Sequence, residues 1–302
     1  MMSQRVINWG IFALICIIWG SSFILMKWGM YDKHLQPVLS PYHVAALRML
    51  SAGIVMLPFL YFSLKDLPRK LLGTVLLSGW LGSFIPAFLF CIAETRIDGA
   101  LTGSLNSLTP IFVIVTGTLL FNIKTSREKV WGVMVGLVGS ALLLYSNMSK
   151  PSGYLAYTGF VILATVLYGI NVNMVHSRLA GVSSLQIATV AFTGLIPPSI
   201  IVLLISGYFN QPLQEPAYLL STLSSCILGI FGTAAASVLF YILVKKAGGL
   251  FASLVTYGIP FVAILWGVYY GEKVTLMQVI ALCIILLGVY LANKPSAKKS
   301  TA

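Results

Sequence analysis

Two basic side chains stand inside apolar stretches of this sequence, where a charge is costly. Lys27 ends the apolar run that begins at Ile11, and Arg48 lies within the next run. A charge at the centre of a membrane helix costs on the order of 2.5–3.5 kcal/mol on insertion scales, so it should face a cavity or a partner. Together the two could attract a carboxylate-bearing solute. Alternatively, Lys27 extends to the membrane surface, and Arg48 binds backbone carbonyls or Glu94.

Two prolines, Pro110 and Pro260, mark a second place where polar chemistry can arise. A proline inside a helix removes an amide donor and clashes with the preceding turn, so the helix kinks. The freed carbonyls and the polar side chains beside them could line a cavity near the membrane midplane. Those side chains are Asn106, Thr109, Thr256 and Tyr257. The alternative is that the prolines only bend helices to fit the bundle.

Two further groups of candidates lie around an aromatic residue that is followed by glycine, Trp19-Gly20 in one group and Tyr168-Gly169 in the other. They comprise Trp19, Ser21, Ser22 and Phe23 in one run, and Tyr168, Asn171 and Asn173 in another. Their hydroxyls and amides could contact a solute, and their rings could form its walls. The competing interpretation is that the polar groups only bond neighbouring helices and the aromatics only pack.

The sequence lacks the residue patterns that catalysis, metal binding or proton coupling through a buried acid would need. No Asp or Glu stands in the middle of an apolar run, which weakens the case for proton coupling through a buried acid. His34, His43 and His176 are scattered, each of the four cysteines lies in a different run, and no HExxH, GxSxG or glycine-rich phosphate loop occurs. We therefore expect no enzyme, no metal and no cofactor. His43 is a candidate titrating group, although an interfacial structural role is the simpler interpretation.

The elements that must position these residues are membrane helices. The chain has 302 residues, of which 58% are hydrophobic and 9% charged, far below the roughly one quarter charged residues of a soluble domain. Lipid must be the solvent for its apolar surface. The sequence predicts an all-α integral membrane protein with ten transmembrane helices, at 9–30, 41–63, 71–93, 99–121, 130–147, 154–175, 185–206, 218–243, 249–270 and 276–293.

The net charge of +12 reflects orientation in the membrane. The Lys and Arg residues form no stripe with interleaved aromatics, so we expect no nucleic-acid partner. An even number of spans places thirteen of them on the side of the termini and four on the other, with Lys27 and Arg48 inside the runs. Because basic loops stay inside, we expect a multi-pass protein of the cell (inner) membrane with both termini cytoplasmic, including a basic tail at 294–302.

The sequence also repeats itself at an offset of 150 residues. Between Gly79 and Gly117 nine residues recur at the shifted positions, and the matched pairs include Gly82 with Gly232 and Pro110 with Pro260. Residues 9–148 and 154–293 are thus two copies of five spans each. An odd number of spans makes the second copy enter the membrane inverted. Inverted repeats are typical of secondary transporters, whose alternating access is a rocking of one half against the other.

Several motifs in this order resemble EamA-like carriers of the drug/metabolite transporter superfamily. They are Trp19-Gly20-Ser21-Ser22-Phe23, Arg48, Asn106-Ser107-Leu108-Thr109-Pro110, and Tyr257-Gly258-Ile259-Pro260 with Gly271-Glu272. The resemblance covers nearly the whole chain and implies secondary transport, often export, of amino acids or related small metabolites. Asn122 departs from the pattern, because it stands where the first copy would carry the counterpart of Glu272.

Other functions stay open at this point. Within the same superfamily the chain could exchange phosphorylated sugars or nucleotide-sugars, which would require several cations for phosphate, or export hydrophobic drugs. An intramembrane enzyme lacks its residues, and a channel would carry rings of charge or carbonyls around an oligomeric axis. Gly132, Gly136 and Gly139 form a small-residue pattern that permits a close helix contact, either within the chain or in a homodimer.

Overall fold

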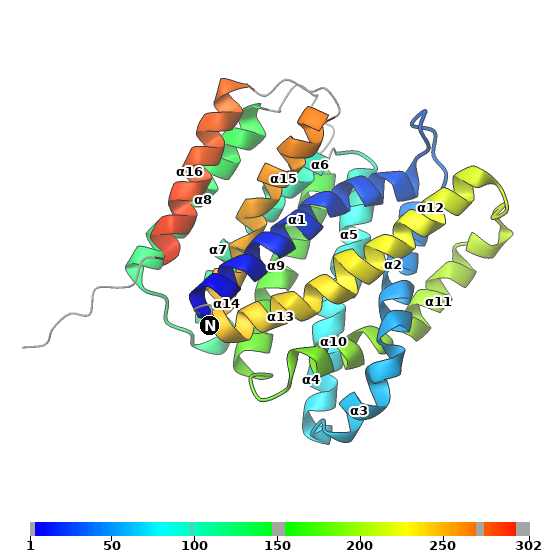
Figure 1. Cartoon of the computed structure of the whole chain (residues 1–302), viewed down its shortest axis with the longest axis horizontal. Helices are drawn as coiled ribbons and strands as arrows, with labels where there is room; N and C mark the ends of the chain where they lie inside the picture. Colours follow the sequence, from blue (N-terminus) through cyan, green and yellow to red (C-terminus); the bar gives the residue numbers. More distant parts are fainter. Residues whose placement is uncertain (1–3, 98, 147–154, 270–274, 294–302) are drawn as a thin grey trace, which may run out of the picture.

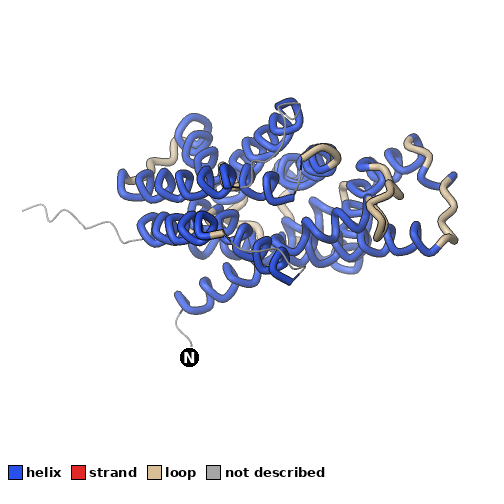
Figure 2. The backbone as a smooth tube through the Cα atoms, turned by 90° about the horizontal axis from the view of Figure 1, so that it is seen from above, coloured by secondary structure: helices blue, strands red, loops and turns tan. Residues whose placement is uncertain are grey.

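The computed structural model describes residues 4–97, 99–146, 155–269 and 275–293. Its regular structure in those ranges is helical, with loops between the helices (Figure 2) and one isolated β-bridge between Tyr31 and Pro37. The predicted all-α class is therefore confirmed. The predicted tail 294–302 and the motif Gly271-Glu272 lie outside the described residues.

Each predicted span is covered by one helix or by a chain of consecutive helices. The first half contains α1 (Gln4–Met30), α2 (Pro41–Met56), η1 (Leu57–Phe59), α3 (Leu60–Lys65), α4 (Arg69–Gly79), the π-helix η2 (Trp80–Phe84), α5 (Ile85–Glu94), α6 (Gly99–Asn106), α7 (Thr109–Phe121) and α8 (Arg127–Ser146). The second half contains α9 (Leu155–Ser177), α10 (Ser184–Thr193), α11 (Ile196–Ile205), η3 (Tyr208–Asn210), α12 (Pro216–Ile227), the π-helix η4 (Leu228–Ala235), α13 (Ala236–Ala247), α14 (Gly249–Ser253), α15 (Val255–Tyr269) and α16 (Leu276–Asn293).

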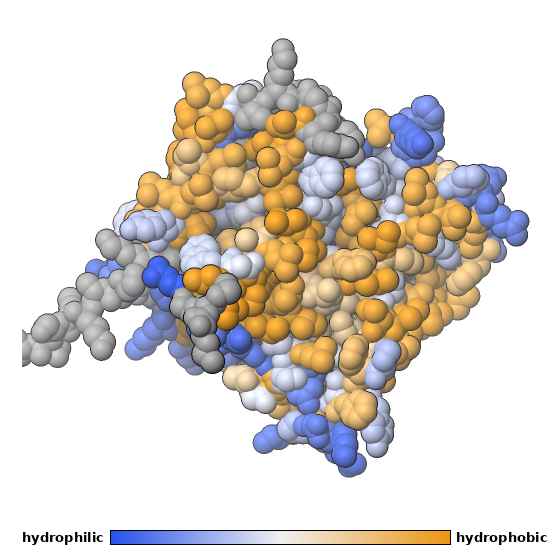
Figure 3. Space-filling model, in the orientation of Figure 1, coloured by the Kyte–Doolittle hydropathy of each residue, from blue (hydrophilic) through white to orange (hydrophobic). Residues whose placement is uncertain are grey.

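The described helices include seven that are long and apolar enough to cross a membrane, with two shorter apolar helices beside them. The shorter two are Thr109–Phe121 and Leu276–Ala292. A multi-pass membrane protein follows from these helices, whereas the number of ten crossings stays a prediction. The face shown in Figure 3 agrees, because apolar side chains cover its broad middle and hydrophilic ones gather at its margins, for example around the α3–α4 turn.

The first helix of each half packs against the other half. In Figure 1, α1 lies across α13 and α15, and its neighbours include α12, α13 and α15 of the second half. Correspondingly, α9 packs on α5 and α7 of the first half. The two halves are thereby interlocked, and the polar residues of α1 and α9 are brought to the surface between them.

Several contacts between the halves occur twice, at positions about 150 residues apart. A side chain at Gly20 would meet Val262 of α15, and one at Gly169 would meet Phe112 of α7. Likewise, a side chain at Gly82 would meet Asn171, and one at Gly232 would meet Ser22. These glycines allow the helices to approach closely, which explains why several of the residues matched between the two copies are glycines.

The sequence predicted equivalent kinks at the two prolines, but the prolines take different places in their helices. The helix breaks before Pro110, at Ser107 and Leu108, so that Pro110 lies in the first turn of α7, where its missing N–H costs nothing. Pro260 lies inside the continuous helix α15, and the break in that half comes at Leu254. The breaks therefore follow Asn106 and Ser253, which are 147 residues apart.

The departure at Asn122 has a local physical reason. Asn122 adopts the left-handed conformation, with φ of 53°, and its N–H bonds to the carbonyl of Gly117. Asn is among the few residues other than glycine that tolerate this conformation at the end of a helix. Asn122 therefore ends α7.

His43 has a structural place at the start of α2. Its ring accepts a hydrogen bond from the N–H of Ser40, its N–H bonds the Ser40 hydroxyl, and its Nε2 lies 3.0 Å from the carbonyl oxygen of Ser206. This arrangement is a capping box that also ties α2 to the end of α11.

The small-residue pattern of α8 is used within the chain. Helix α8 lies beside α16 along its length (Figure 1), where side chains at Gly132, Gly139 and Gly288 would each meet backbone atoms of the facing helix. Gly136 faces the ring of Tyr257. This pattern is therefore not available for the homodimer contact that was its alternative.

Candidate functional site

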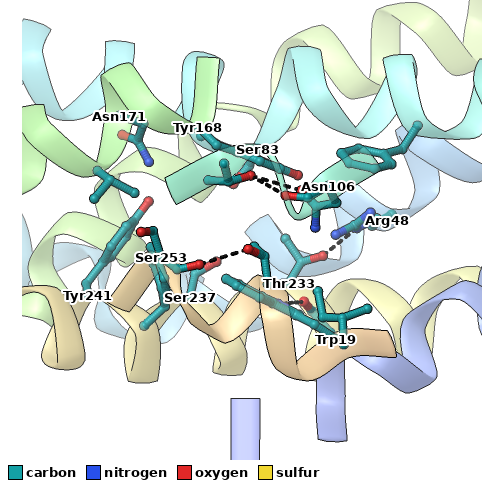
Figure 4. A pocket seen from close by; sticks show the side chains of 18 of the residues that line it. Trp19, Arg48, Ser83, Asn106, Tyr168, Asn171, Thr233, Ser237, Tyr241 and Ser253 are labelled. Atoms are coloured by element: carbon teal, nitrogen blue, oxygen red, sulfur yellow. Dashed lines mark hydrogen bonds between the residues drawn. The ribbon is translucent and has the colours of Figure 1, made fainter. Parts of the chain in front are cut away.

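A cavity of about 90 Å³ lies between the two halves. Helices α1, α2, α5, α6, α7 and η2 form one part of its wall, and α9, α13, α14, α15 and η4 form the other. Its lining residues are Trp19, Phe23, Met26, Arg48, Gly82, Ser83, Phe90, Asn106, Thr109, Tyr168, Asn171, Val172, Gly232, Thr233, Ser237, Phe240, Tyr241, Ser253, Thr256 and Ile259. Figure 4 shows how the labelled side chains converge on it.

The structure brings about half of the predicted site residues to this cavity. They are Trp19, Phe23, Arg48, Asn106, Thr109, Tyr168, Asn171 and Thr256. The others, Ser21, Ser22, Lys27, Pro110, Asn173, Tyr257 and Pro260, do not line it. Lys27 and Arg48 thus do not form a pair, because Lys27 is exposed on the outer surface of α1.

The remaining polar candidates bond other helices or their own. The hydroxyl of Ser21 accepts a hydrogen bond from Nε1 of Trp266 at 2.9 Å. Ser22 donates to the carbonyl of Ile18, and buried Tyr257 donates to the carbonyl of Val133 at 2.8 Å. Asn173 lies 3 % exposed at the contact of α9 with α7.

Asn173→Ala is expected to destabilise the fold without changing solute binding. Its Nδ2 donates to the carbonyl of Val113 at 2.8 Å, to Oγ1 of Thr116 at 2.9 Å and to the carbonyl of Gly169 at 3.0 Å. Bonds of this kind between membrane helices contribute modestly to stability. We therefore expect the free energy of unfolding to fall by about 1–2 kcal/mol, as measured by thermal unfolding in detergent. Ser177→Ala, which removes a bond within α9 only, is the control. Equal unfolding temperatures for both variants would contradict the assignment.

Arg48 is held at the cavity by the π-helix η4. Its Nε donates to Oγ1 of Thr233 at 2.6 Å (Figure 4). Thr233 belongs to the wide turn of η4, where its hydroxyl also bonds the carbonyl of Leu228. π-Helical turns occur often at functional sites because they displace one side chain from the helical register. Here the turn aims a hydroxyl at the guanidinium.

Asn171 occupies the opposite end of the cavity. Its Oδ1 accepts a hydrogen bond from the Ser78 hydroxyl at 2.6 Å. In Figure 4 the side-chain nitrogen of Asn171 points into the cavity, and the hydroxyl of Tyr241 points toward the same amide. Asn171 therefore presents the N–H donors of its amide to the cavity.

Aromatic rings form the apolar walls in two matching pairs. The rings of Trp19 and Phe240 lie 5.1 Å apart between centroids, and those of Tyr168 and Phe90 lie 5.9 Å apart. Trp19 corresponds to Tyr168 in the repeat, and Phe90 to Phe240. One ring from each half therefore stands on each side of the cavity.

Several lining residues were not singled out from the sequence. They include Met26, Ser83, Thr233, Ser237, Tyr241 and Ser253. A signal existed for two of them, because Ser83 and Thr233 stand at equivalent positions one residue after the matched pair Gly82 and Gly232. Ser237 and Tyr241 have Ala87 and Cys91 as counterparts, so the repeat carried no signal for them.

The electrostatic character of the cavity is simple. Arg48 is the charged member of its lining, and neither Asp nor Glu belongs to that lining among the residues described. Groups of three His, Cys, Asp or Glu that could hold a metal ion do not occur in the described part of the chain. The arrangement can bind a small solute through one cation, several hydroxyl and amide groups, and aromatic faces.

Comparison with known proteins agrees with a membrane transporter. The chain is 24% identical to an "Uncharacterized transporter" of Archaeoglobus fulgidus, with 94% of this chain and 98% of the relative covered. It is also 24% identical to the "Uncharacterized inner membrane transporter YedA" of Escherichia coli K12, with 94% and 89% covered. A solved crystal structure shares the fold, with a TM-score of 0.71 at 18% identity over 94% of this chain and 95% of that chain.

The model of the EamA-like transporter family matches twice, at residues 8–145 and 156–294. Together the two matches cover nearly the whole chain, and the gap between them lies where the first copy of the sequence repeat ends and the second begins. The chain therefore belongs to the EamA-like transporter family, as a multi-pass membrane transporter of the drug/metabolite superfamily.

Proposed function

We propose that this protein is a secondary transporter of the inner membrane that exports small metabolites, such as amino acids, by alternating access. The observation that carries the proposal is the cavity, whose lining comes in equivalent pairs from both halves. Such pairs are Trp19 with Tyr168, Ser83 with Thr233, and Phe90 with Phe240. A site built in this way can be opened to either side by similar movements of the two halves.

The proposal includes two inverted repeats of five spans each, residues 9–148 and 154–293, with both termini in the cytoplasm. The contacts that recur about 150 residues apart support the pseudo-two-fold relation, because an axis between the halves would generate them. The excess of Lys and Arg on the side of the termini supports the orientation.

The alternatives within the superfamily differ in what the cavity must hold. An exchanger of phosphorylated sugars or nucleotide-sugars needs several cations around phosphate, whereas Arg48 is the cation that the described lining supplies. The aromatic walls suit an exporter of hydrophobic drugs better, so this second candidate is kept in the experiment.

The experiment is a thermal-shift screen on purified protein, followed by flux measurements in proteoliposomes. Amino acids, sugar phosphates and apolar drugs form the screened classes. We expect a stabilising metabolite to be taken up saturably and its uptake to be accelerated by unlabelled solute inside the vesicles. Linear, unaccelerated flux would instead indicate a channel, and stabilisation by apolar drugs alone would favour the drug exporter.

A further inference from the structure

We infer that the cavity recognises organic monocarboxylates with a small uncharged body, that Arg48 binds their carboxylate, and that an ammonium group is not needed. The inference rests on the proposed transport function and narrows its solute class. Four properties of the cavity carry it: the free edge of the guanidinium, the lack of a counter-charge, the volume, and the one place where the lining of the two halves differs in charge.

The guanidinium of Arg48 is positioned with its binding edge open. Its Nε is engaged by Thr233 at 2.6 Å, and it makes no ion pair with any residue of the described ranges. Arg48 lines the cavity, and among the described residues its two terminal nitrogens have no hydrogen-bond partner, so they are available to a solute. A planar pair of N–H donors matches the two oxygens of a carboxylate, and such paired, charge-assisted bonds are among the strongest in proteins.

The described lining of the cavity holds no acidic partner for an ammonium group. Neither Asp nor Glu belongs to it, so that only uncharged oxygens, such as those of Ser83, Ser237 and Ser253, could accept hydrogen bonds from an ammonium group. The aromatic faces could attract a cation weakly. However, a second positive charge in so small a space would be repelled by Arg48 in a medium of low dielectric constant. An α-amino group on the solute therefore lowers its affinity for this cavity.

The volume and the walls define the body of the solute. The cavity of about 90 Å³ is smaller than the roughly 150 Å³ that accommodates benzene in an engineered protein cavity. Trp19, Phe240, Tyr168 and Phe90 give it apolar sides. A body of two or three carbons fits these limits, whereas a sugar phosphate or a nucleotide does not.

Arg48 also breaks the symmetry of the site. A side chain at Gly229 would meet the carbonyl carbon of Arg48, and one at the equivalent Gly79 would meet the backbone of Ala191. Ala191 therefore takes the place of Arg48 in the second half. A cation within a membrane protein is costly, and the repeat itself does not require one at this place, because alanine stands there in the second half.

The test is isothermal titration calorimetry of the purified full-length protein with four probes that share one short body. They are propanoate, alanine, ethylamine and propan-1-ol. We expect propanoate to bind most tightly, alanine about tenfold or more weakly, and the amine and the alcohol without measurable heat. Exchange in proteoliposomes should follow the same order.

Three variants assign the effect to Arg48. Arg48→Gln should weaken the binding of propanoate about 10- to 100-fold, as expected for lost hydrogen bonds to a charged group. Arg48→Lys keeps the charge without the paired donors and should fall between Gln and wild type. Lys27→Gln removes the same charge from an exposed position of α1 and should bind as the wild type does. The unfolding temperature of Arg48→Gln should be equal or higher, because an uncompensated charge is removed.

Different failures separate this inference from the transport proposal. If alanine binds and exchanges while propanoate is more than tenfold weaker, the inference is overturned and amino acid transport stands. Tight binding of the amine or the alcohol, or wild-type affinity in Arg48→Gln, also overturns it. If none of the four probes binds or exchanges, the inference fails, and transport is then judged by the wider solute screen.

Discussion

Gly132→Leu is expected to separate α8 from α16 and to lower the unfolding temperature by roughly 6–12 °C. A Cβ at this position would meet Cα of Ala292 at 2.6 Å and its Cβ at 2.8 Å, as well as its backbone nitrogen. Backbone atoms cannot rotate away as a side chain can, so the helices must move apart. Overpacking costs typically 1–3 kcal/mol, and a backbone clash belongs at the upper end, which corresponds to a shift of this size.

The matched control is Gly159→Leu on α9, where a Cβ would meet nothing within 4 Å. Its unfolding temperature should stay close to that of the wild type, because leucine also favours the helix more than glycine does. Differential scanning fluorimetry and size-exclusion chromatography in detergent measure both variants. A change of oligomeric state in Gly132→Leu, without a change in unfolding temperature, would contradict the packing described and restore the homodimer interpretation.

The helical membrane architecture could be predicted from the sequence because membrane helices have a distinctive, strongly apolar composition. Long apolar runs interrupted by short charged loops fix the elements, and the matched glycines from Gly79 to Gly117 fix how the halves correspond. The number of crossings is harder, since helices such as α7 (Thr109–Phe121) are short and broken from their neighbours. A run of apolar residues does not say where its helix is interrupted.

The site could be predicted only in part, because orientation around a helix decides it. Trp19 and Phe23 share one face of α1 and line the cavity, whereas Ser21 and Ser22 between them bond Trp266 and the carbonyl of Ile18. Polar residues such as Asn173 carry the same signal whether they bind a solute or a neighbouring helix. The π-helices η2 and η4 add a shift of register that turns Ser83 and Thr233 inward, and periodicity alone does not reveal such a shift.

Leucine at either Gly82 or Gly232 is expected to weaken solute binding and exchange strongly while leaving the protein folded. Both glycines line the cavity within the π-helices. A side chain at Gly82 would meet the side-chain amide of Asn171, and one at Gly232 would meet Oγ of Ser22 at 2.8 Å. These neighbours are side chains that can yield, so the helices stay in place but the cavity is filled. Overpacking of 1–3 kcal/mol translates into a loss of solute affinity of about 5- to 150-fold.

Gly73→Leu is the control for this pair, because it lies on α4 of the same predicted span and a Cβ there would meet nothing within 4 Å. Proteoliposome exchange and calorimetry with the best solute compare the three variants. Since Gly82 and Gly232 occupy equivalent places in the two repeats, their losses should be similar in size. Full exchange in one variant and none in the other would contradict a site to which both halves contribute equally. Similar losses are the result expected of one site shared by both halves, which the proposed rocking of inverted repeats requires.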